Sequence, residues 1–173
     1  YSDVTAKDVV RQMLVAFDRQ VAPEIGEGVA GFTPWQVVTL ASIVEREARV
    51  PDERPLIASV FLNRLRLGIP LQADPTVQYA LANDPANAEA FGYWKAELTV
   101  DDLRLDSTYN TYVYVGLPPG PICNPGLDAI RAVLRPAQTN YLFFVAKPDG
   151  SHAFAETLEE HERNVARYQG GSE

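Results

Sequence analysis

The chain has 173 residues with 46% hydrophobic and 22% charged side chains, a composition typical of a globular protein with one core. Its net charge of −8 argues against a nucleic-acid partner, because phosphate binding needs a basic surface. A single cysteine excludes an intrachain disulfide, and the two histidines lack the spacing of a helical metal pair, so we expect neither a metal nor a cofactor.

The N-terminal part of the chain predicts two amphipathic helices. Thr5 can cap a helix that runs to about Ala22. The apolar positions on one face of this helix are Val9, Val10, Met13, Leu14, Phe17 and Val21. After a Gly-containing loop, Thr33 and Gln36 form a capping box that begins a second helix, which ends before the next proline.

Two further helices are predicted before the middle of the chain. Residues 52–67 are mostly apolar and are followed by a glycine, which favours helix termination. Asp74 precedes a proline and can cap a short helix from Pro75 to about Ala82. Residues 83–100 are polar and contain turn residues, so we expect them to be irregular.

The rest of the chain predicts strands around Gly- and Pro-rich segments. Tyr and Thr alternate near residues 108–115, which favours a strand, and a stiff GLPPGPI loop follows. We expect a helix over about 124–134, strands over 141–146 and 151–155 around a KPDG turn, and a last helix that a Thr157 capping box begins. Helices come first and a small antiparallel sheet comes later, so the predicted fold class is α+β.

Two glutamates, Glu45 and Glu47, interrupt the apolar helix segment ASIVERE. At about 100° per residue they lie on opposite edges of the apolar stripe, so spacing does not distinguish them. An ordinary surface role is possible, and Glu45 has Arg49 one turn later at a favourable ion-pair spacing. A carboxyl group that is half-buried at such an edge has a raised pKa and can donate a proton near neutral pH.

Several segments together resemble the YceG-like (MltG) family of endolytic murein transglycosylases. They cover about residues 38–168 in the family's order: LASIVEREA, RPLIASVFLNRL, PLQADPTVQYAL, YNTYVYVGLPPGPICNPG, YLFFVAKPDGSHAF and a terminal EH-x-x-NVARY. The resemblance implies a catalytic domain over 31–173, in which a helical part that carries the catalytic glutamate packs with the small sheet and follows lysozyme-like active-site logic. Residues 1–30 would be an N-terminal helix that leads into this domain.

The resemblance implies that Glu45, the first glutamate of the motif, is catalytic and that Glu47 is structural. The family cleaves the β-1,4 bond between N-acetylmuramic acid and N-acetylglucosamine without water. One carboxyl group protonates the glycosidic oxygen and then takes the proton of the muramyl C6 hydroxyl as that oxygen attacks C1. The product is a 1,6-anhydromuramyl end, and a single carboxyl group is enough, whereas ordinary glycosidases use two.

The candidates for substrate binding are aromatic and short polar side chains, which sugar clefts require. The family match favours Tyr109 and Asn110 within the YNTY segment. Structural hydrogen bonds explain Asn63 about as well as substrate binding does, and for His152 they are the favoured explanation. The full set of predicted substrate-binding residues is Gln72, Asp74, Thr76, Tyr79, Tyr109, Asn110, Asn63 and His152. We assign no role to Cys123 and a structural role to His161.

Three alternatives stay open. A non-catalytic peptidoglycan-binding module would use the aromatic residues and would not need a perturbed glutamate. A muramidase that uses water would need a second carboxylate, for which Asp74 is the best candidate. A pyridoxal-phosphate lyase would need a Schiff-base lysine, and Lys7, Lys95 and Lys147 do not lie in segments that suit one.

The resemblance also implies where the parent protein works. Members of the family have an N-terminal membrane helix and a LysM-like region before a catalytic part that faces the periplasm or cell wall. The sequence begins at Tyr1 and not at a methionine, so we expect it to be a fragment whose anchor lies upstream. We expect peptidoglycan glycan strands as the substrate, peptidoglycan synthases as partners and a location at the inner membrane.

Overall fold

The computed structural model describes residues 3–26 and 31–170. The domain boundary that we predicted at residue 30 therefore lies outside the described residues. No helix within the described ranges is long and apolar enough to cross a membrane.

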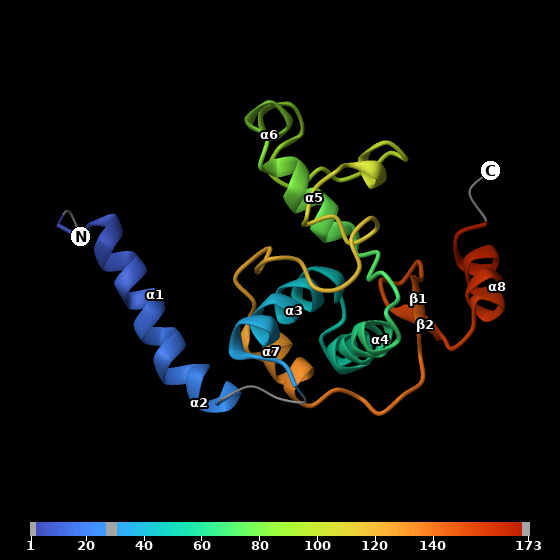
Figure 1. Cartoon of the computed structure of the whole chain (residues 1–173), viewed down its shortest axis with the longest axis horizontal. Helices are drawn as coiled ribbons and strands as arrows, with labels where there is room; N and C mark the ends of the chain where they lie inside the picture. The colour runs from blue at the N-terminus through green and yellow to red at the C-terminus, as the bar shows by residue number, and fades with distance from the viewer. Residues whose placement is uncertain (1–2, 27–30, 171–173) are drawn as a thin grey trace.

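Three helices form the centre of the molecule, namely α3 (Pro34–Glu47), α4 (Arg54–Leu67) and α7 (Leu127–Leu134) (Figure 1). The capping box predicted for α3 is confirmed, because the Thr33 amide donates to Gln36 Oε1 at 2.9 Å and the Gln36 amide donates to Thr33 Oγ1 at 3.4 Å. The side chains buried where the three helices meet include Leu40, Val44, Ile57, Phe61 and Ile130. This core fixes the end of α3, on which both glutamates lie.

The remaining elements surround this core. Helices α5 (Asp74–Ala82) and α6 (Pro85–Phe91) extend from one side of it in Figure 1. The 3₁₀ turns η1 (Pro51–Glu53) and η2 (Asp102–Arg104) precede α4 and follow α6 in the chain. Residues 85–91 were predicted to be irregular, but Asp84 accepts a hydrogen bond from the Ala86 amide at 2.9 Å and caps a short helix there.

A two-stranded antiparallel hairpin completes the α+β fold and confirms the predicted fold class. Strand β1 (Phe143–Ala146) pairs with β2 (His152–Ala155), with Phe143 opposite Ala155 and Ala146 opposite His152. The hairpin packs on α4 through the rings of Phe61 and Phe144, whose centroids are 5.8 Å apart. Helix α8 (Leu158–Tyr168) packs on the hairpin and begins at the predicted Thr157 cap.

The strand predicted near residues 108–115 is wrong, because this segment forms tight turns. The side chain of Asn110 explains the difference. Its Nδ2 donates to the carbonyl oxygens of Leu103 and Leu105, and its Oδ1 accepts from the Tyr112 amide at 2.9 Å. A buried asparagine thus satisfies backbone groups that a neighbouring strand would otherwise have to satisfy.

The N-terminal helix α1 (Ala6–Gln20) extends away from the core and joins it through α2 (Ala22–Ile25) (Figure 1). Its capping box is present, but none of its residues is buried. The face predicted to be apolar is there, yet Val9, Met13 and Leu14 are 49%, 54% and 61% exposed.

Candidate active site

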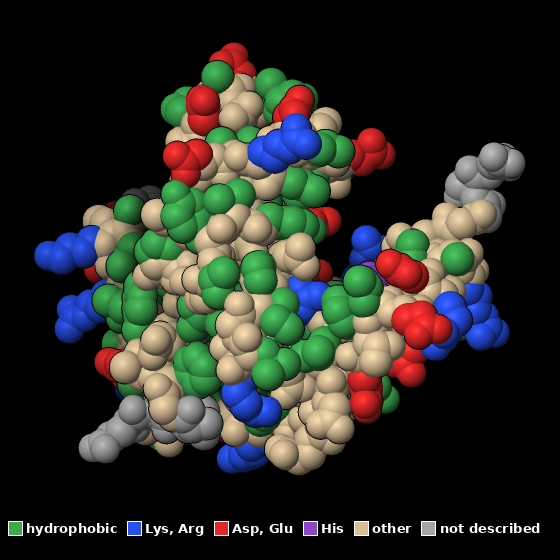
Figure 2. All heavy atoms as spheres, turned by 45° about the vertical axis from the view of Figure 1, so that its right-hand side comes forward, with side chains coloured by type: hydrophobic (Ala, Val, Ile, Leu, Met, Phe, Trp, Pro, Cys, Tyr) green, Lys and Arg blue, Asp and Glu red, His purple; other side chains and the backbone are tan. Residues whose placement is uncertain are grey.

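A pocket of about 270 Å³ lies where the end of α3 meets α4, the start of α5, the turns around Tyr112, β1 and α8. Figure 2 shows the surface hollowed between the α5–α6 region and α8. The residues that line the pocket are Glu47, Arg64, Leu71, Gln72, Asp74, Tyr112, Phe144 and His161. Side chains far apart in the sequence therefore line one pocket with two carboxyl groups, those of Glu47 and Asp74.

Glu47 is the last residue of α3 and has a strongly shifted proton affinity. Burial raises its pKa, the negative charge of Asp74 raises it further, and the charge of Arg46 opposes the rise, so that the pKa is about 8. A carboxyl group of this kind is protonated at neutral pH. It therefore has the property that proton donation to a leaving oxygen requires.

Asp74 does not cap α5 in the predicted way. The helix begins at Asp74 itself, Ala73 is its N-cap, and no side chain caps it. Instead, Asp74 Oδ1 accepts a hydrogen bond from the hydroxyl of Tyr112 at 2.5 Å. Burial, followed by this hydrogen bond, raises the pKa of Tyr112, so the phenol keeps its proton and continues to donate.

A buried threonine pair joins the Tyr112 turn to α5. Thr111 Oγ1 accepts from the Ala73 amide at 3.0 Å and lies 2.9 Å from Thr76 Oγ1. The carbonyl oxygen of Thr111 also accepts from the Gln72 amide at 3.0 Å. These bonds hold Tyr112 and Asp74 on the same side of the pocket.

Gln72 is held in an unusual conformation at the wall of the pocket. Its φ of 53° is the only positive value among the non-glycine residues that the structure describes. Arg64 Nη1 donates to Gln72 Oε1 at 3.1 Å and to the carbonyl oxygens of Pro70 and Leu71 at 3.0 Å each. Left-handed backbone at a residue other than glycine costs energy and persists where surrounding contacts enforce it, often in ligand sites.

His161 lines the pocket from α8, and no sequence pattern places it there. Its ring stacks on Phe143 with centroids 5.2 Å apart. Burial lowers the pKa of His161, and the positive charge of Arg64 lowers it further, so the neutral imidazole is favoured.

Glu45 lies outside the residues that line this pocket. Its Oε2 accepts from the Gly126 amide at 3.3 Å, and its Oε1 is 3.8 Å from Arg54 Nη2. These contacts join the end of α3 to the start of α7 and to α4. The catalytic role that the resemblance implied for Glu45 stays a prediction.

Three of the predicted substrate-binding residues have polar groups that are engaged inside the protein, and their role in binding stays a prediction. Thr76 and Asn110 are fully buried, and their polar groups bond to Thr111 and to backbone groups, as described above. His152 is 7% exposed, and Glu53 binds both its amide and its Nδ1, at 3.0 and 2.7 Å.

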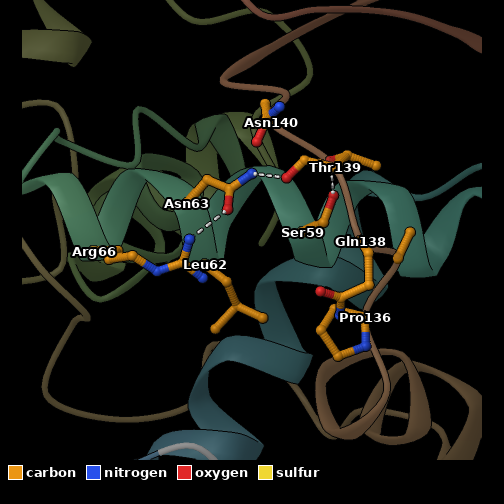
Figure 3. A pocket seen from close by; sticks show the side chains of 9 residues that line it. Ser59, Leu62, Asn63, Arg66, Pro136, Gln138, Thr139 and Asn140 are labelled. Atoms are coloured by element: carbon orange, nitrogen blue, oxygen red, sulfur yellow. Dashed lines mark hydrogen bonds between the residues drawn. The ribbon is translucent and has the colours of Figure 1, made fainter.

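Asn63 lies in a different hollow (Figure 3). Its Nδ2 donates to the carbonyl oxygens of Thr139 and Tyr141 at 2.9 and 3.0 Å, and its Oδ1 accepts from Arg66. Of the two explanations offered for this residue, the structural one is therefore favoured.

Gln72 and Asp74 are the predicted residues that the structure brings to Glu47. Tyr79 and Tyr109 pack together, with ring centroids 4.7 Å apart, but neither lines the pocket, so their role in binding stays a prediction. Cys123 is partly buried, and its Sγ donates to the Ser42 carbonyl oxygen at 3.3 Å. Within the described residues, no three His, Cys, Asp or Glu side chains are placed to hold a metal ion.

Comparison with known proteins agrees with the segments that carried the resemblance. A model of the YceG-like family matches residues 1–167. A Bacillus subtilis protein named endolytic murein transglycosylase is 38% identical over 167 residues, which are 96% of this chain and 44% of that protein. A Streptococcus pneumoniae protein of the same name is 36% identical over 95% of this chain and 29% of its own length.

A solved structure also matches the fold. The crystal structure of a yceG-like protein from Listeria monocytogenes superimposes with a TM-score of 0.80 at 39% sequence identity. The match covers 93% of this chain and 50% of that one. The chain thus spans about half or less of the length of each of these relatives.

Proposed function

The chain belongs to the YceG-like family, and we propose that it is the catalytic part of an endolytic lytic transglycosylase that cleaves peptidoglycan glycan strands. The names of the relatives support this activity, and so does the chemistry of the pocket. The observation that carries the proposal is a half-buried carboxyl group, Glu47, with a pKa of about 8, in the lining of a pocket that also contains Arg64, Gln72, Asp74 and Tyr112.

In this proposal Glu47 acts first as an acid and then as a base. Its proton goes to the glycosidic oxygen as the bond between muramyl C1 and that oxygen breaks, which frees the C4 hydroxyl of N-acetylglucosamine. The muramyl C6 oxygen then bonds to C1 and gives its proton to Glu47, so a 1,6-anhydro ring closes and no water is consumed. A carboxyl group with a pKa near the working pH can serve in both directions.

The neighbours of Glu47 suit the other requirements of this reaction. The negative charge of Asp74 keeps the Glu47 proton in place, and it would also stabilise positive charge that develops at C1. Gln72 and Tyr112 offer hydrogen-bonding groups to sugar hydroxyls and acetamides. We propose this set, rather than Glu45 with Tyr109 and Asn110, as the site.

Asp74 also favours a second candidate function. A hydrolytic muramidase needs one protonated and one ionised carboxyl group, and the pocket contains both Glu47 and Asp74. In such an enzyme Asp74 would act as a nucleophile or would activate water. The two reactions break the same bond and differ only in the new muramyl end.

Analysis of the products separates these candidates. Purified glycan strands are digested and the new ends are identified by mass spectrometry. The proposal predicts 1,6-anhydromuramyl ends, whereas reducing muramic acid ends would establish hydrolysis and a role for Asp74. Binding without cleavage would instead favour a peptidoglycan-binding module, provided that the full-length protein also fails to cleave.

The proposal includes the setting of the reaction. Cleavage inside nascent strands has to occur beside the enzymes that synthesise them, which supports peptidoglycan synthases as partners and an anchor in the cell membrane. Fractionation of cells that express the full-length protein tests this expectation, because an anchored protein sediments with membranes and stays there in high salt.

A further inference from the structure

A second hollow lies across α4 from the Glu47 pocket. It consists of two adjoining pockets of about 310 and 820 Å³ that share Leu62, Arg66, Pro136 and Gln138, and we call it the α4 groove. Arg64 lines the Glu47 pocket and Arg66 lines the α4 groove. Residues two apart on a helix point about 200° away from each other, so the two hollows lie on opposite faces of α4.

One end of the α4 groove is apolar and stiff. The Trp35 side chain is 60% exposed in it, and its indole N–H donates to the Pro119 carbonyl oxygen at 3.0 Å. Leu117 and Pro118 continue this wall. The prolines limit the conformations of the wall, so this end is preformed for an apolar group.

The other end of the α4 groove presents polar groups that lack partners in the protein (Figure 3). Arg66 Nη1 donates to Asn63 Oδ1 at 3.3 Å, and Asn63 is itself fixed by two carbonyl oxygens. Within the described part of the chain, the other N–H groups of Arg66 and the amides of Gln138 and Asn140 make no hydrogen bond. A guanidinium group and two amides are therefore available to a ligand.

Charge indicates what kind of ligand this is. Arg66 is the only charged residue among the described residues that line the α4 groove, in a chain whose net charge is −8. A guanidinium group without a neighbouring carboxylate matches a ligand carboxylate. The side-chain amides of Gln138 and Asn140 match the N–H and C=O groups of a peptide.

We propose that the α4 groove binds the peptide stem of the same peptidoglycan strand whose glycan occupies the Glu47 pocket. A stem carboxylate binds Arg66, stem amides bond to Gln138 and Asn140, and an apolar stem side chain contacts Trp35. An extended stem of five residues reaches about 17 Å, and α4 with its side chains has a diameter of about 10–12 Å. This assignment rests on the proposed function, because it takes peptidoglycan as the substrate.

The first test compares strands that carry stems with the same strands after an amidase has removed the stems. We expect the wild-type protein to have the higher kcat/KM on stem-bearing strands. Arg66→Glu should reduce this preference about tenfold, as the loss of one charge-assisted hydrogen bond implies. Arg135→Glu is the matched control, since Arg135 is exposed beside Pro136 but does not line the groove, and it should keep the preference.

The second test does not depend on cleavage and so distinguishes failure of this assignment from failure of the proposed function. A synthetic stem pentapeptide with free carboxylates is titrated into the ¹⁵N-labelled protein. We expect the Trp35 indole signal to shift in the wild-type protein and in Arg135→Glu, but not in Arg66→Glu and not with a peptide whose carboxylates are amidated.

Several results would overturn the assignment. One is that the wild-type protein cleaves strands with and without stems at equal rates. Another is that Arg66→Glu loses rate equally on both kinds of strand, which would mean that the α4 groove holds glycan. An Arg135→Glu variant that behaves like Arg66→Glu would show that only the general charge of the surface matters. If the peptide does not shift the Trp35 indole signal of the wild-type protein, the α4 groove does not bind the stem.

Discussion

Glu45 and Glu47 are separated by one residue, yet their surroundings differ in almost every respect. Glu45 accepts a backbone N–H from Gly126 and lies near Arg54, which are contacts that suit an ionised carboxylate. Glu47 lines a pocket, and Asp74 adds a negative charge instead of a compensating positive one. The helical periodicity of the sequence puts both glutamates at edges of the same apolar stripe. Which of them is the better candidate for the catalytic acid therefore depends on partners that lie far away in the sequence.

The pH dependence of cleavage tests the coupling between Glu47 and Asp74. The acid must be protonated in the free enzyme, so kcat/KM should fall as the pH rises through about 8. Asp74→Asn removes a negative charge that raises the Glu47 pKa. We therefore expect the alkaline limb to move to lower pH, whatever happens to the maximal rate. The measurement is the pH profile of kcat/KM for strand cleavage.

Asp101→Asn is the control for this experiment, because the Asp101 side chain is 94% exposed and lies outside the pocket. It removes the same charge and should leave the limb in place. If the alkaline limb of the kcat/KM profile has the same pH midpoint in Asp74→Asn as in the wild-type protein, Asp74 does not raise the pKa of the catalytic acid.

The elements with local signals were predictable from the sequence, and those that depend on distant partners were not. Capping residues gave the start of α3, and an apolar run followed by Gly68, whose φ is 66°, gave the end of α4. The hairpin followed from its strand propensity and turn residues. The turns near Tyr112 depend on how the Asn110 side chain bonds to residues 103 and 105, and strand alternation does not reveal such bonds.

The same reasoning explains which site residues were predictable. Gln72 and Asp74 lie in one short motif, and the structure brings both to the pocket. Tyr112 was within the motif that we favoured, but the family match directed attention to Tyr109 and Asn110. His161 reaches the pocket only because α8 packs on the hairpin, a tertiary arrangement with no local signal.

The threonine pair between the Tyr112 turn and α5 gives a prediction about stability. Thr111→Val keeps the shape of the side chain but leaves the buried Ala73 amide without its acceptor. We expect the free energy of unfolding to fall by about 2 kcal/mol in urea denaturation. Cleavage should slow about tenfold as well, because Tyr112 loses its support.

Thr108→Val is the matched control, since Thr108 is exposed in the same segment. It should change the free energy of unfolding by less than about 0.5 kcal/mol. Equal loss of stability in the two variants would show that the Thr111 hydroxyl does not join the turn to α5.

In the molecule as a whole, α1 projects from the packed body (Figure 1). The amphipathic pattern of α1 predicted a buried face, but the helix contacts the body mainly near its end and through α2. The pattern thus identified the helix correctly and could not show whether a partner within this chain covers it. The hydrophobic stabilisation that anchors α3, α4 and α7 is missing along most of α1.

Hydrogen exchange followed by mass spectrometry tests this division. A helix of 15 residues without buried side chains is only marginally stable by itself. Amides of α1 should therefore exchange at least about a hundredfold faster than those of α3, whose residues form the core. Protection of α1 equal to that of α3 would mean that its apolar face is covered in solution.

Glu47 is the proposed proton-transfer group, and paired amide substitutions test this role most directly. Strand cleavage is measured for the wild-type protein, Glu47→Gln and Glu45→Gln, with thermal unfolding as a check that each variant folds. Glu47→Gln cannot donate the proton, so we expect its rate to fall about a thousandfold. Glu45→Gln keeps an oxygen that can accept the Gly126 N–H, and its rate should stay within about threefold of the wild-type rate. The reverse result, in which a folded Glu45→Gln variant is inactive and Glu47→Gln still cleaves, would contradict the account and return the catalytic role to Glu45.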